Sequence, residues 1–311
     1  MTQVCVLLQR QLLLLAKDPS LYIARCVMNI IMVGIFSIVY LEARKRIQTQ
    51  AQQRCFFFVF CMAIPANLAI GVVILSNFGL KSIAREVKDG MYHPLAQWLA
   101  SSIVQAPMMF VLAACALWPA FWGAQLPVQA YLPAVSVFAA LLWCFEGIAE
   151  CFSLVKNPLT GMLYFLFFFM FSFLFCGMFV AFDDVIIVLR WICFVTPLGY
   201  SMRSMLYAIM SESPDYEGAA YCTPLETLNP GTVNETVCPE RGFYCPDDPY
   251  FISCFGVTGT QILDSIGVNF PVISGTDVRI SDDVLKVIAI GAVGRAVFII
   301  CLLPASFSYA A

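Results

Sequence analysis

The chain has 311 residues, of which 61% are hydrophobic and 12% are charged, and its formal net charge is −3. Ordinary globular domains carry about 25% charged residues, so this composition excludes a soluble globular protein, and the small net charge excludes an electrostatic basis for a nucleic-acid partner. Repeated apolar runs of about 20 residues instead predict an all-α membrane protein, because a helix of that length crosses a bilayer.

Residues 1–20 predict a helix that lies in the membrane interface. Apolar residues recur at helical spacing from Val4 to Leu15, while Arg10 and Lys17 belong to a polar face. This amphipathic pattern is typical of a helix that lies along the interface rather than across the membrane. Pro19 then ends the helix, because the residue before a proline disfavours helical backbone.

Six transmembrane helices are predicted, five within residues 21–182 and the sixth within residues 284–311. The apolar runs place them at Leu21–Leu41, Cys55–Phe78, Leu95–Trp122, Tyr131–Val155, Gly161–Phe182 and Val284–Leu303. Arg25 lies near the start of the first span, where its charge can extend to the interface. A polar connection over Glu42–Arg54 follows, and Pro65 interrupts the second span.

A charged loop over residues 79–94 joins the second and third spans. Within it lie Lys81, Arg85, Glu86, Lys88, Asp89 and the only histidine, His93. Such a loop is most often a solvated turn, and the alternative is a contact surface for a partner in water. We expect a short helix over Leu80–Lys88 that ends at Asp89-Gly90, because glycine permits the left-handed backbone of a helix end.

Residues 183–283 predict a large external loop between the fifth and sixth spans. The stretch Ile186–Met210 is broken by charged residues and a proline, which favours short re-entrant helices covered by protein. The loop then carries an N-glycosylation sequon at Asn234 and four cysteines, Cys222, Cys238, Cys245 and Cys254. In an oxidising compartment four cysteines allow three pairings.

Among these pairings, Cys222 with Cys238 is the first to expect because the two residues flank the sequon. A cross-link between subunits through another of the four is the alternative.

The orientation of the chain in the membrane follows from two signals. Six basic residues on the side of the termini and the charged loop outnumber four between Arg44 and Arg54, which favours the first side as cytoplasmic. The sequon requires the long loop to be external, so we expect cytoplasmic termini and a plasma-membrane location.

Ionisable residues within the predicted spans are the next candidates for function. Glu146 and Glu150 lie one turn apart on one face of the fourth span, and Arg295 lies inside the sixth. A charge at membrane depth marks a buried pair or a pathway. The hypotheses are a structural pair between Arg295 and a glutamate, a proton or substrate relay, and exposure to the lumen or interface.

Catalytic motifs are missing from the sequence. No G-x-x-x-x-G-K-[ST] phosphate loop occurs, and one histidine leaves no basis for a histidine metal cluster or a Ser-His-Asp triad. We therefore expect no catalytic residue, no metal site and no cofactor bound by this chain.

Several segments together resemble the membrane domain of ABC exporters of the G subfamily, the White and pleiotropic-drug-resistance type. In chain order these segments are Lys17-Asp18-Pro19, Arg85-Glu86, Gly90 to Pro94, Trp98-Leu99-Ala100, Ala106-Pro107, Phe175 to Phe179, Thr196 to Tyr200, Gly259 to Gly267 and Asp282-Asp283. Their order and spacing carry the resemblance, which runs over almost the whole chain.

The resemblance implies an exporter of lipidic or amphipathic molecules that pairs two such membrane domains, as a homo- or heterodimer, around a central path. It also implies an ATP-binding domain, which would hold ATP and Mg. That domain is usually N-terminal, and this sequence begins just before the connecting helix, so we expect it in cis on a longer chain or in trans on another polypeptide. The alternative is a truncated, non-transporting membrane subunit that dimerises with full-length relatives and modulates them.

Individual positions also follow from the resemblance. A coupling interface for the ATP-binding domain is implied at Arg85, Glu86, Lys88 and Tyr92. Candidates for the substrate path are Asn67, Met170, Phe173, Met178 and Phe179, with Phe179 as a possible hydrophobic gate. Ordinary helix packing against neighbouring helices or membrane lipids is the alternative for these five residues.

Overall fold

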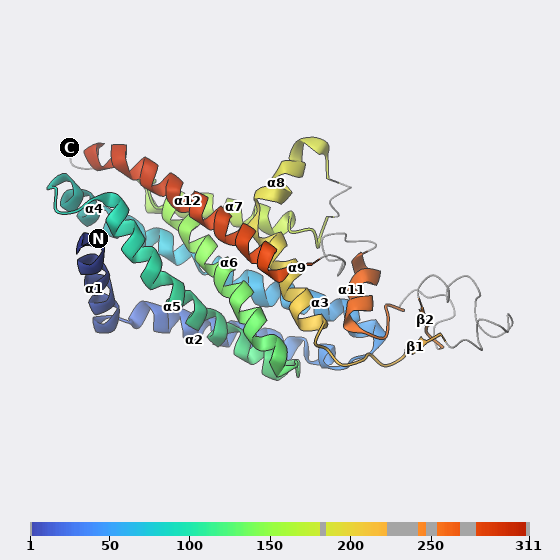
Figure 1. The fold of residues 1–311 in the computed structure, drawn as a ribbon. Helices are drawn as coiled ribbons and strands as arrows, with labels where there is room; N and C mark the ends of the chain where they lie inside the picture. Colours follow the sequence, from blue (N-terminus) through green and yellow to red (C-terminus); the bar gives the residue numbers. More distant parts are fainter. Residues whose placement is uncertain (1, 181–184, 223–241, 247–253, 268–277, 309–311) are drawn as a thin grey trace.

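The computed structural model describes residues 2–180, 185–222, 242–246, 254–267 and 278–308, and this part of the chain is an elongated helical bundle (Figure 1). In chain order the helices are α1 (Thr2–Lys17), α2 (Ser20–Val39), α3 (Gln48–Asn67), α4 (Ile70–Lys88), α5 (Pro94–Gly123), α6 (Tyr131–Phe152), α7 (Pro158–Leu174), α8 (Arg190–Val195), α9 (Pro197–Met210), α11 (Gly259–Gly267) and α12 (Ile280–Ser308). The described residues also form three short 3-10 turns: η1 (Leu41–Arg44), η2 (Val128–Ala130) and η4 (Ile187–Leu189). Strands β1 (Ala220–Tyr221) and β2 (Phe243–Tyr244) pair antiparallel.

Five helical segments of the described chain are long and apolar enough to cross a membrane. They are Ser20–Val39, Gln48–Leu80, Pro94–Gly123, Val128–Phe152 and Ile280–Cys301. These segments overlap the predicted first, second, third, fourth and sixth spans. The protein is therefore a multi-pass membrane protein built from α-helices.

The predicted fifth span differs from the structure. Helix α7 has 17 residues and ends at Leu174, so it rises about 25 Å, less than the roughly 30 Å of a bilayer core. The backbone turns after Leu174, where Gly177 has a φ of 85°. The helix predicted over Gly161–Phe182 thus ends earlier than expected, and the six-span count stays a prediction. The predicted re-entrant stretch holds η4, α8 and α9, whose entry into the membrane also stays a prediction.

The α3–α4 pair forms one span with a break in the middle. Pro65 lies inside α3 and lacks the N–H that a helix needs. Just after it the helical hydrogen bonds are interrupted: the Leu68 N–H donates to the Pro65 carbonyl, three residues earlier, at 3.2 Å. Helix α4 then starts at Ile70. Beyond the span, α4 continues to Lys88, and Gly90 follows with a φ of 71°. The predicted helix end at Asp89-Gly90 is therefore confirmed.

The predicted polar connection over Glu42–Arg54 is shorter than expected because α3 already begins at Gln48. Arg54 is fully buried, and its guanidinium lies 5.9 Å from the centroid of the Tyr216 ring. Contact with an aromatic face stabilises a desolvated cation. The burial of Arg54 thus departs from its predicted place in a polar connection.

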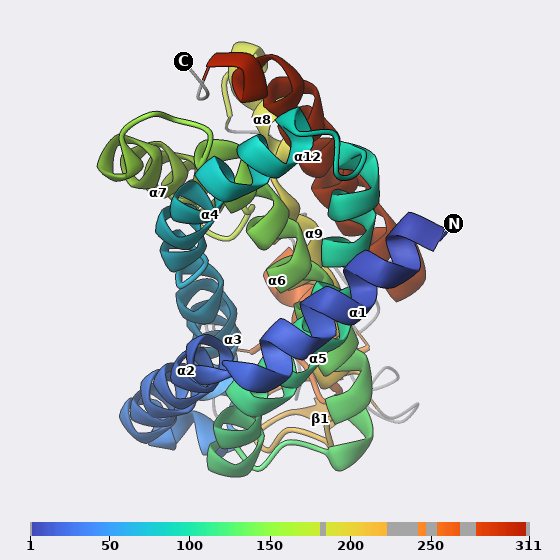
Figure 2. The ribbon, with the colours of Figure 1, turned by 90° about the vertical axis from the view of Figure 1, so that its left-hand side faces the viewer.

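Helix α6 lies at the centre of the bundle, surrounded by α3, α4, α5 and α9 (Figure 2). Its contact with α12 depends on glycines, as membrane helices require for close backbone approach. A Cβ atom at Gly291 would lie 2.9 Å from the Cα of Cys144, and one at Gly147 would lie 2.8 Å from the Arg295 side chain. Glycine at 147 therefore leaves the space that the arginine side chain occupies.

An ion pair fixes the start of α12 against α9. The Asp283 carboxylate, 1% exposed, accepts hydrogen bonds from Arg203 Nε at 2.8 Å and from Ser204 Oγ at 3.0 Å. Arg203 is one of the charged residues that break the stretch Ile186–Met210, and Asp283 belongs to a segment that resembles the family; nothing in their spacing indicated this contact.

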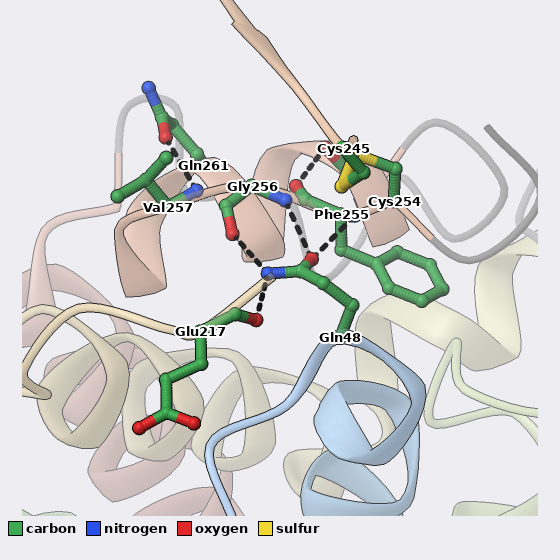
Figure 3. Close-up of a disulfide and its surroundings, with 9 residues drawn as sticks. Gln48, Glu217, Cys245, Cys254, Phe255, Gly256, Val257 and Gln261 are labelled. Atoms are coloured by element: carbon green, nitrogen blue, oxygen red, sulfur yellow. Dashed lines mark hydrogen bonds between the residues drawn. A yellow bond between two sulfur atoms is a disulfide. The ribbon is translucent and has the colours of Figure 1, made fainter. Parts of the chain in front are cut away.

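One glutamine side chain joins α3 to the region next to a disulfide (Figure 3). Gln48 Nε2 donates to the carbonyls of Glu217 at 3.2 Å and Gly256 at 2.8 Å, and its Oε1 accepts from the N–H groups of Phe255 at 2.9 Å and Gly256 at 3.2 Å. The amide thereby pairs four backbone groups from two segments that are distant in sequence. We call this arrangement the Gln48 clamp.

A disulfide joins Cys245 to Cys254, the residue directly before the segment that Gln48 holds. It ties the end of β2 to the Gln48 clamp. Cys222 is disulfide-bonded as well. Its expected partner Cys238 and the sequon residue Asn234 lie outside the described residues.

Replacing Gln48 by Ala should destabilise the protein by about 2 to 4 kcal/mol, because four backbone groups lose their partner and two of them, the N–H and the carbonyl of Gly256, form buried hydrogen bonds. Hydrogen–deuterium exchange should show faster exchange at the Phe255 and Gly256 amides, together with a lower melting temperature. Gln52→Ala is the matched control, since Gln52 lies one turn further along α3 and is exposed. Unchanged exchange in the Gln48 variant would contradict the clamp.

Candidate functional site

Two opposite charges meet between α2 and α6 in the bundle interior. Arg25 is 9% exposed and Glu146 is 3% exposed. Nη1 of Arg25 lies 3.3 and 3.4 Å from the two carboxylate oxygens of Glu146. The prediction that Arg25 extends to the interface is therefore wrong, because its guanidinium points into the bundle and pairs with the opposite charge of Glu146, which offsets the cost of burying it.

A second buried group joins α5, α6 and α12. Arg295 is fully buried; its Nη2 donates to Gln105 Oε1 at 2.8 Å and to the Trp143 carbonyl at 3.2 Å. Its guanidinium carbon lies 3.8 Å from the centroid of the Trp143 ring. Gln105 Nε2 in turn donates to Glu150 Oε1 at 2.7 Å, and Arg295 Nε lies 3.8 Å from Glu150 Oε2. Gln105 thus bridges the two charges.

These two groups, Arg25–Glu146 and Arg295–Gln105–Glu150, form what we call the buried charge network. It holds two positive and two negative groups and is neutral overall. Of its members, sequence analysis identified Glu146, Glu150 and Arg295 as intramembrane charges and weighed a pair with Arg295. It missed the pairing of Arg25 and the bridge through Gln105. Gln105 could have been found as a polar amide inside the predicted third span.

Removing one partner of the Arg25–Glu146 pair should cost about 3 to 5 kcal/mol, because the other charge stays buried and unpaired. We expect Glu146→Gln and Arg25→Gln each to lower the melting temperature and the yield of monodisperse protein. The double variant should lose less than the sum of the two.

Glu42→Gln serves as the control, since the Glu42 side chain is 67% exposed. If Glu146 and Arg25 instead form a proton relay, both single variants should be produced in normal yield and should show an altered pH dependence of transport. That result would reject the structural pair.

A third polar cluster fixes α1 to the junction of α4 and α5. Arg10 donates from Nη1 to Glu86 Oε2 at 2.8 Å and from Nη2 to Glu86 Oε1 at 3.0 Å. The Tyr92 hydroxyl donates to Glu86 Oε2 at 2.7 Å. Beside these bonds Leu7, Tyr92 and Ala100 form a small buried apolar cluster. We call Arg10, Glu86 and Tyr92 the junction cluster.

Electrostatics in the junction cluster follow from the shared carboxylate. Hydrogen bonds from Arg10 and then Tyr92 lower the pKa of Glu86 to about 2. Burial, and then the bond to Glu86, raise the pKa of the Tyr92 hydroxyl. Glu86 therefore stays ionised at neutral pH, and Tyr92 stays protonated and continues to donate.

The structure separates the four residues expected at the coupling interface into two pairs. Glu86 and Tyr92 belong to the junction cluster within this chain. Arg85 and Lys88 are exposed at the end of α4. A partner at this end of the molecule would thus meet Arg85 and Lys88 directly, while Glu86 and Tyr92 connect α4 to α1.

The residues expected on the substrate path lie in different environments. Phe173 and Phe179 pack together with ring centroids 4.8 Å apart, and Phe56 lies 6.4 Å from Phe179. Met178 is 1% exposed and belongs to the core, whereas Met170 is 52% exposed. Asn67 is the last residue of α3, and its buried Oδ1 has no hydrogen-bond partner among the described residues.

Comparison with known families decides the class of the protein. The family model described as ABC-2 type transporter matches residues 2–210. The chain belongs to the ABC-2 type transporter family. Membrane domains of this family generally work with an ATP-binding partner and often dimerise, so this member is a transmembrane transport component. The matched part contains α1 to α9, and with them the junction cluster and all of the buried charge network except Arg295. No curated protein matched the chain.

Replacing Glu86 by Gln tests the junction cluster through pH. We expect a loss of about 1 kcal/mol at neutral pH. The pKa of Glu86 is about 2 in the folded protein against an ordinary 4.5. Its ionised form therefore stabilises the fold above the ordinary value, and this contribution is lost as the pH falls through about 2.

The difference in melting temperature between the unaltered protein and Glu86→Gln should be constant from about pH 7 to about pH 5 and should shrink at lower pH. Lys88→Gln, at the same helix end, should leave the melting temperature unchanged. A difference that grows on acidification would contradict the assigned contacts.

Proposed function

We propose that this ABC-2 family member is the translocation domain of an ATP-driven exporter of the G-subfamily type, which moves lipidic or amphipathic molecules. The observation that supports this most is the junction cluster, because it connects an exposed cationic helix end to the transmembrane bundle. The order of the G-subfamily-like segments along the chain supports the same subfamily. In this proposal the termini are cytoplasmic, the membrane is the plasma membrane and two such domains form a dimer.

The proposed mechanism starts outside this chain, on an ATP-binding domain in cis or in trans that holds ATP and Mg. Closure of that domain would move the end of α4 at Arg85 and Lys88. Because Glu86 bonds both Arg10 and Tyr92, α1 and the start of α5 would move with α4 as one body. Such a rigid-body movement exposes the central path to opposite sides in turn.

The proposed gate of this path is the aromatic group Phe56, Phe173 and Phe179. Aromatic side chains can close a path by excluding water without a charge or a hydrogen bond. Phe179 follows Gly177, whose positive φ turns the chain after α7. A movement of α7 would therefore displace Phe179 from Phe56 on α3 and open the path.

Reversing the charge at Arg85 and Lys88 together (Arg85→Glu with Lys88→Glu) tests the proposal in a reconstituted complex with the ATP-binding domain. We expect transport per ATP hydrolysed to fall roughly tenfold, as for the loss of one to two kcal/mol of coupling. These residues are better targets than Glu86, because a change at Glu86 also breaks its bonds to Arg10 and Tyr92.

Lys45→Glu is the control, since Lys45 is 61% exposed and follows η1, away from α4. Unaltered transport and ATP hydrolysis in the double variant would contradict a coupling role and favour the alternative that the end of α4 is only solvated. Absence of transport by the unaltered complex, with retained binding to a full-length relative, would favour the non-transporting subunit.

A further inference from the structure

An open cavity of about 320 Å³ lies between η1, the end of α5 and the start of α6. Four aromatic side chains line it, from Trp118, Phe121, Trp122 and Tyr131, and two polar residues, Arg44 and Gln125, complete its lining with apolar neighbours. We call it the aromatic cavity. It takes no part in the buried charge network, the junction cluster or the proposed path.

The Tyr131 ring of the cavity lies at right angles to the Phe121 and Trp118 rings. Tyr131 meets the Phe121 ring at a centroid distance of 4.9 Å and the Trp118 ring at 6.3 Å, each with an interplanar angle of 86°. The Tyr131 hydroxyl donates to the Ala114 carbonyl at 2.8 Å, which fixes the ring. Trp122 remains 78% exposed. Several aromatic side chains that line one cavity have the composition of an aromatic cage, which binds quaternary ammonium groups.

Arg44 adds a free positive charge to the same cavity. It is exposed, and it has no hydrogen bond or ion pair with any residue that the structure describes, whereas its neighbour Lys45 pairs with Glu42. A planar guanidinium with unused donors is suited to a phosphate group. The cavity therefore offers an anion site beside an aromatic cage.

The backbone at Gln125 is unusual in a way that adds to the cavity. Gln125 follows the C-terminus of α5 with a φ of 49°, and the Leu126 N–H donates to the Phe121 carbonyl at 3.1 Å. Glycine is the usual residue at this position of a helix end. A glutamine there adopts a backbone conformation that costs energy, and Gln125 lines the cavity. Arg46 stabilises the turn through a hydrogen bond to the Gln125 carbonyl at 3.4 Å.

The position of the cavity matches the depth of lipid headgroups. It lies where one membrane-spanning segment ends, at Gly123, and the next begins, at Val128. Tryptophan and tyrosine are enriched at this depth. The turn between α5 and α6 lies on the same side of the bundle as β1 and away from the C-terminus (Figure 2).

We propose that the aromatic cavity binds the phosphocholine headgroup of a membrane phospholipid. The trimethylammonium group lies against the aromatic rings around Trp122, and Arg44 binds the phosphate. The charge pattern of the cavity selects this headgroup, because a cation cage next to a cationic phosphate site is complementary to a zwitterion. The alternative is that these aromatic residues belong to an interfacial aromatic belt that does not select between headgroups, and the experiment below distinguishes the two.

The test measures lipid retention by the purified 311-residue chain in detergent. The probes are phosphatidylcholine, phosphatidylethanolamine and phosphatidylglycerol with identical acyl chains, supplied in equal amounts and counted by native mass spectrometry. We expect phosphatidylcholine to be retained over phosphatidylethanolamine by about fivefold or more, the scale of a cation–aromatic contact. Trp122→Ala should abolish this preference, whereas Arg44→Gln should lower retention of all three lipids and leave the preference intact.

Two matched variants control for loss of any exposed tryptophan or cation. Trp191→Ala removes a tryptophan that is 61% exposed on α8, and Lys45→Gln removes the cation next to Arg44. Both should retain lipids as the unaltered chain does. Equal retention of the choline and ethanolamine lipids by the unaltered chain, or equal effects of Trp122→Ala and Trp191→Ala, would overturn the proposal. A preference for phosphatidylglycerol would also overturn the proposal, because it would indicate an anion site that does not bind the trimethylammonium group.

Discussion

Charge burial in a medium without water is the constraint on which the rest of this structure depends. A membrane-embedded guanidinium or carboxylate is tolerated only with a partner close at hand. Arg25 finds Glu146, and Arg295 shares Gln105 with Glu150. Because the partners belong to different helices, satisfying them fixes α2, α5 and α12 around α6. The charge pairs thus determine how these four helices are aligned along one another, and apolar side chains fill the space between them.

Space for these charges comes from the smallest residue. Arg295 can approach α6 because position 147 is a glycine, and Gly291 brings the α12 backbone against Cys144. Membrane helices have no hydrophobic driving force for association, because lipid tails are as apolar as their side chains. They therefore associate through close backbone packing, which small residues such as glycine permit. The glycines and the arginine thus depend on each other: the glycines permit the approach, and the ion pair makes it favourable.

Sequence reasoning reached the features that local chemistry determines. The apolar runs located five of the six predicted spans, and Asp89-Gly90 located the end of α4, because each of these signals is contained in a few consecutive residues. Contacts between distant residues were out of reach. Arg25 and Glu146 are 121 residues apart and Gln48 and Gly256 are 208 apart, and no periodicity encodes such pairings. The end of α7 at Leu174 was missed because the apolar run continues beyond it, and the turn depends on backbone conformation at Gly177.

The distribution of polar contacts also bears on which parts of the bundle can move. The buried charge network joins α2, α5, α6 and α12, and relative movement of these helices would separate charges that have no water to replace their partners. The α3–α4 pair and α7 contribute no member to that network. The α3–α4 pair also contains the break after Pro65, where the helical ladder is already interrupted. A rearrangement that leaves the buried charge network paired and the junction cluster intact is therefore one in which α3, before the break, and α7 shift against the fixed helices. The aromatic contacts of Phe56, Phe173 and Phe179 lie at that boundary, since they join α3 to α7 and to the turn after it, and rings can slide past one another without leaving a polar group unsatisfied.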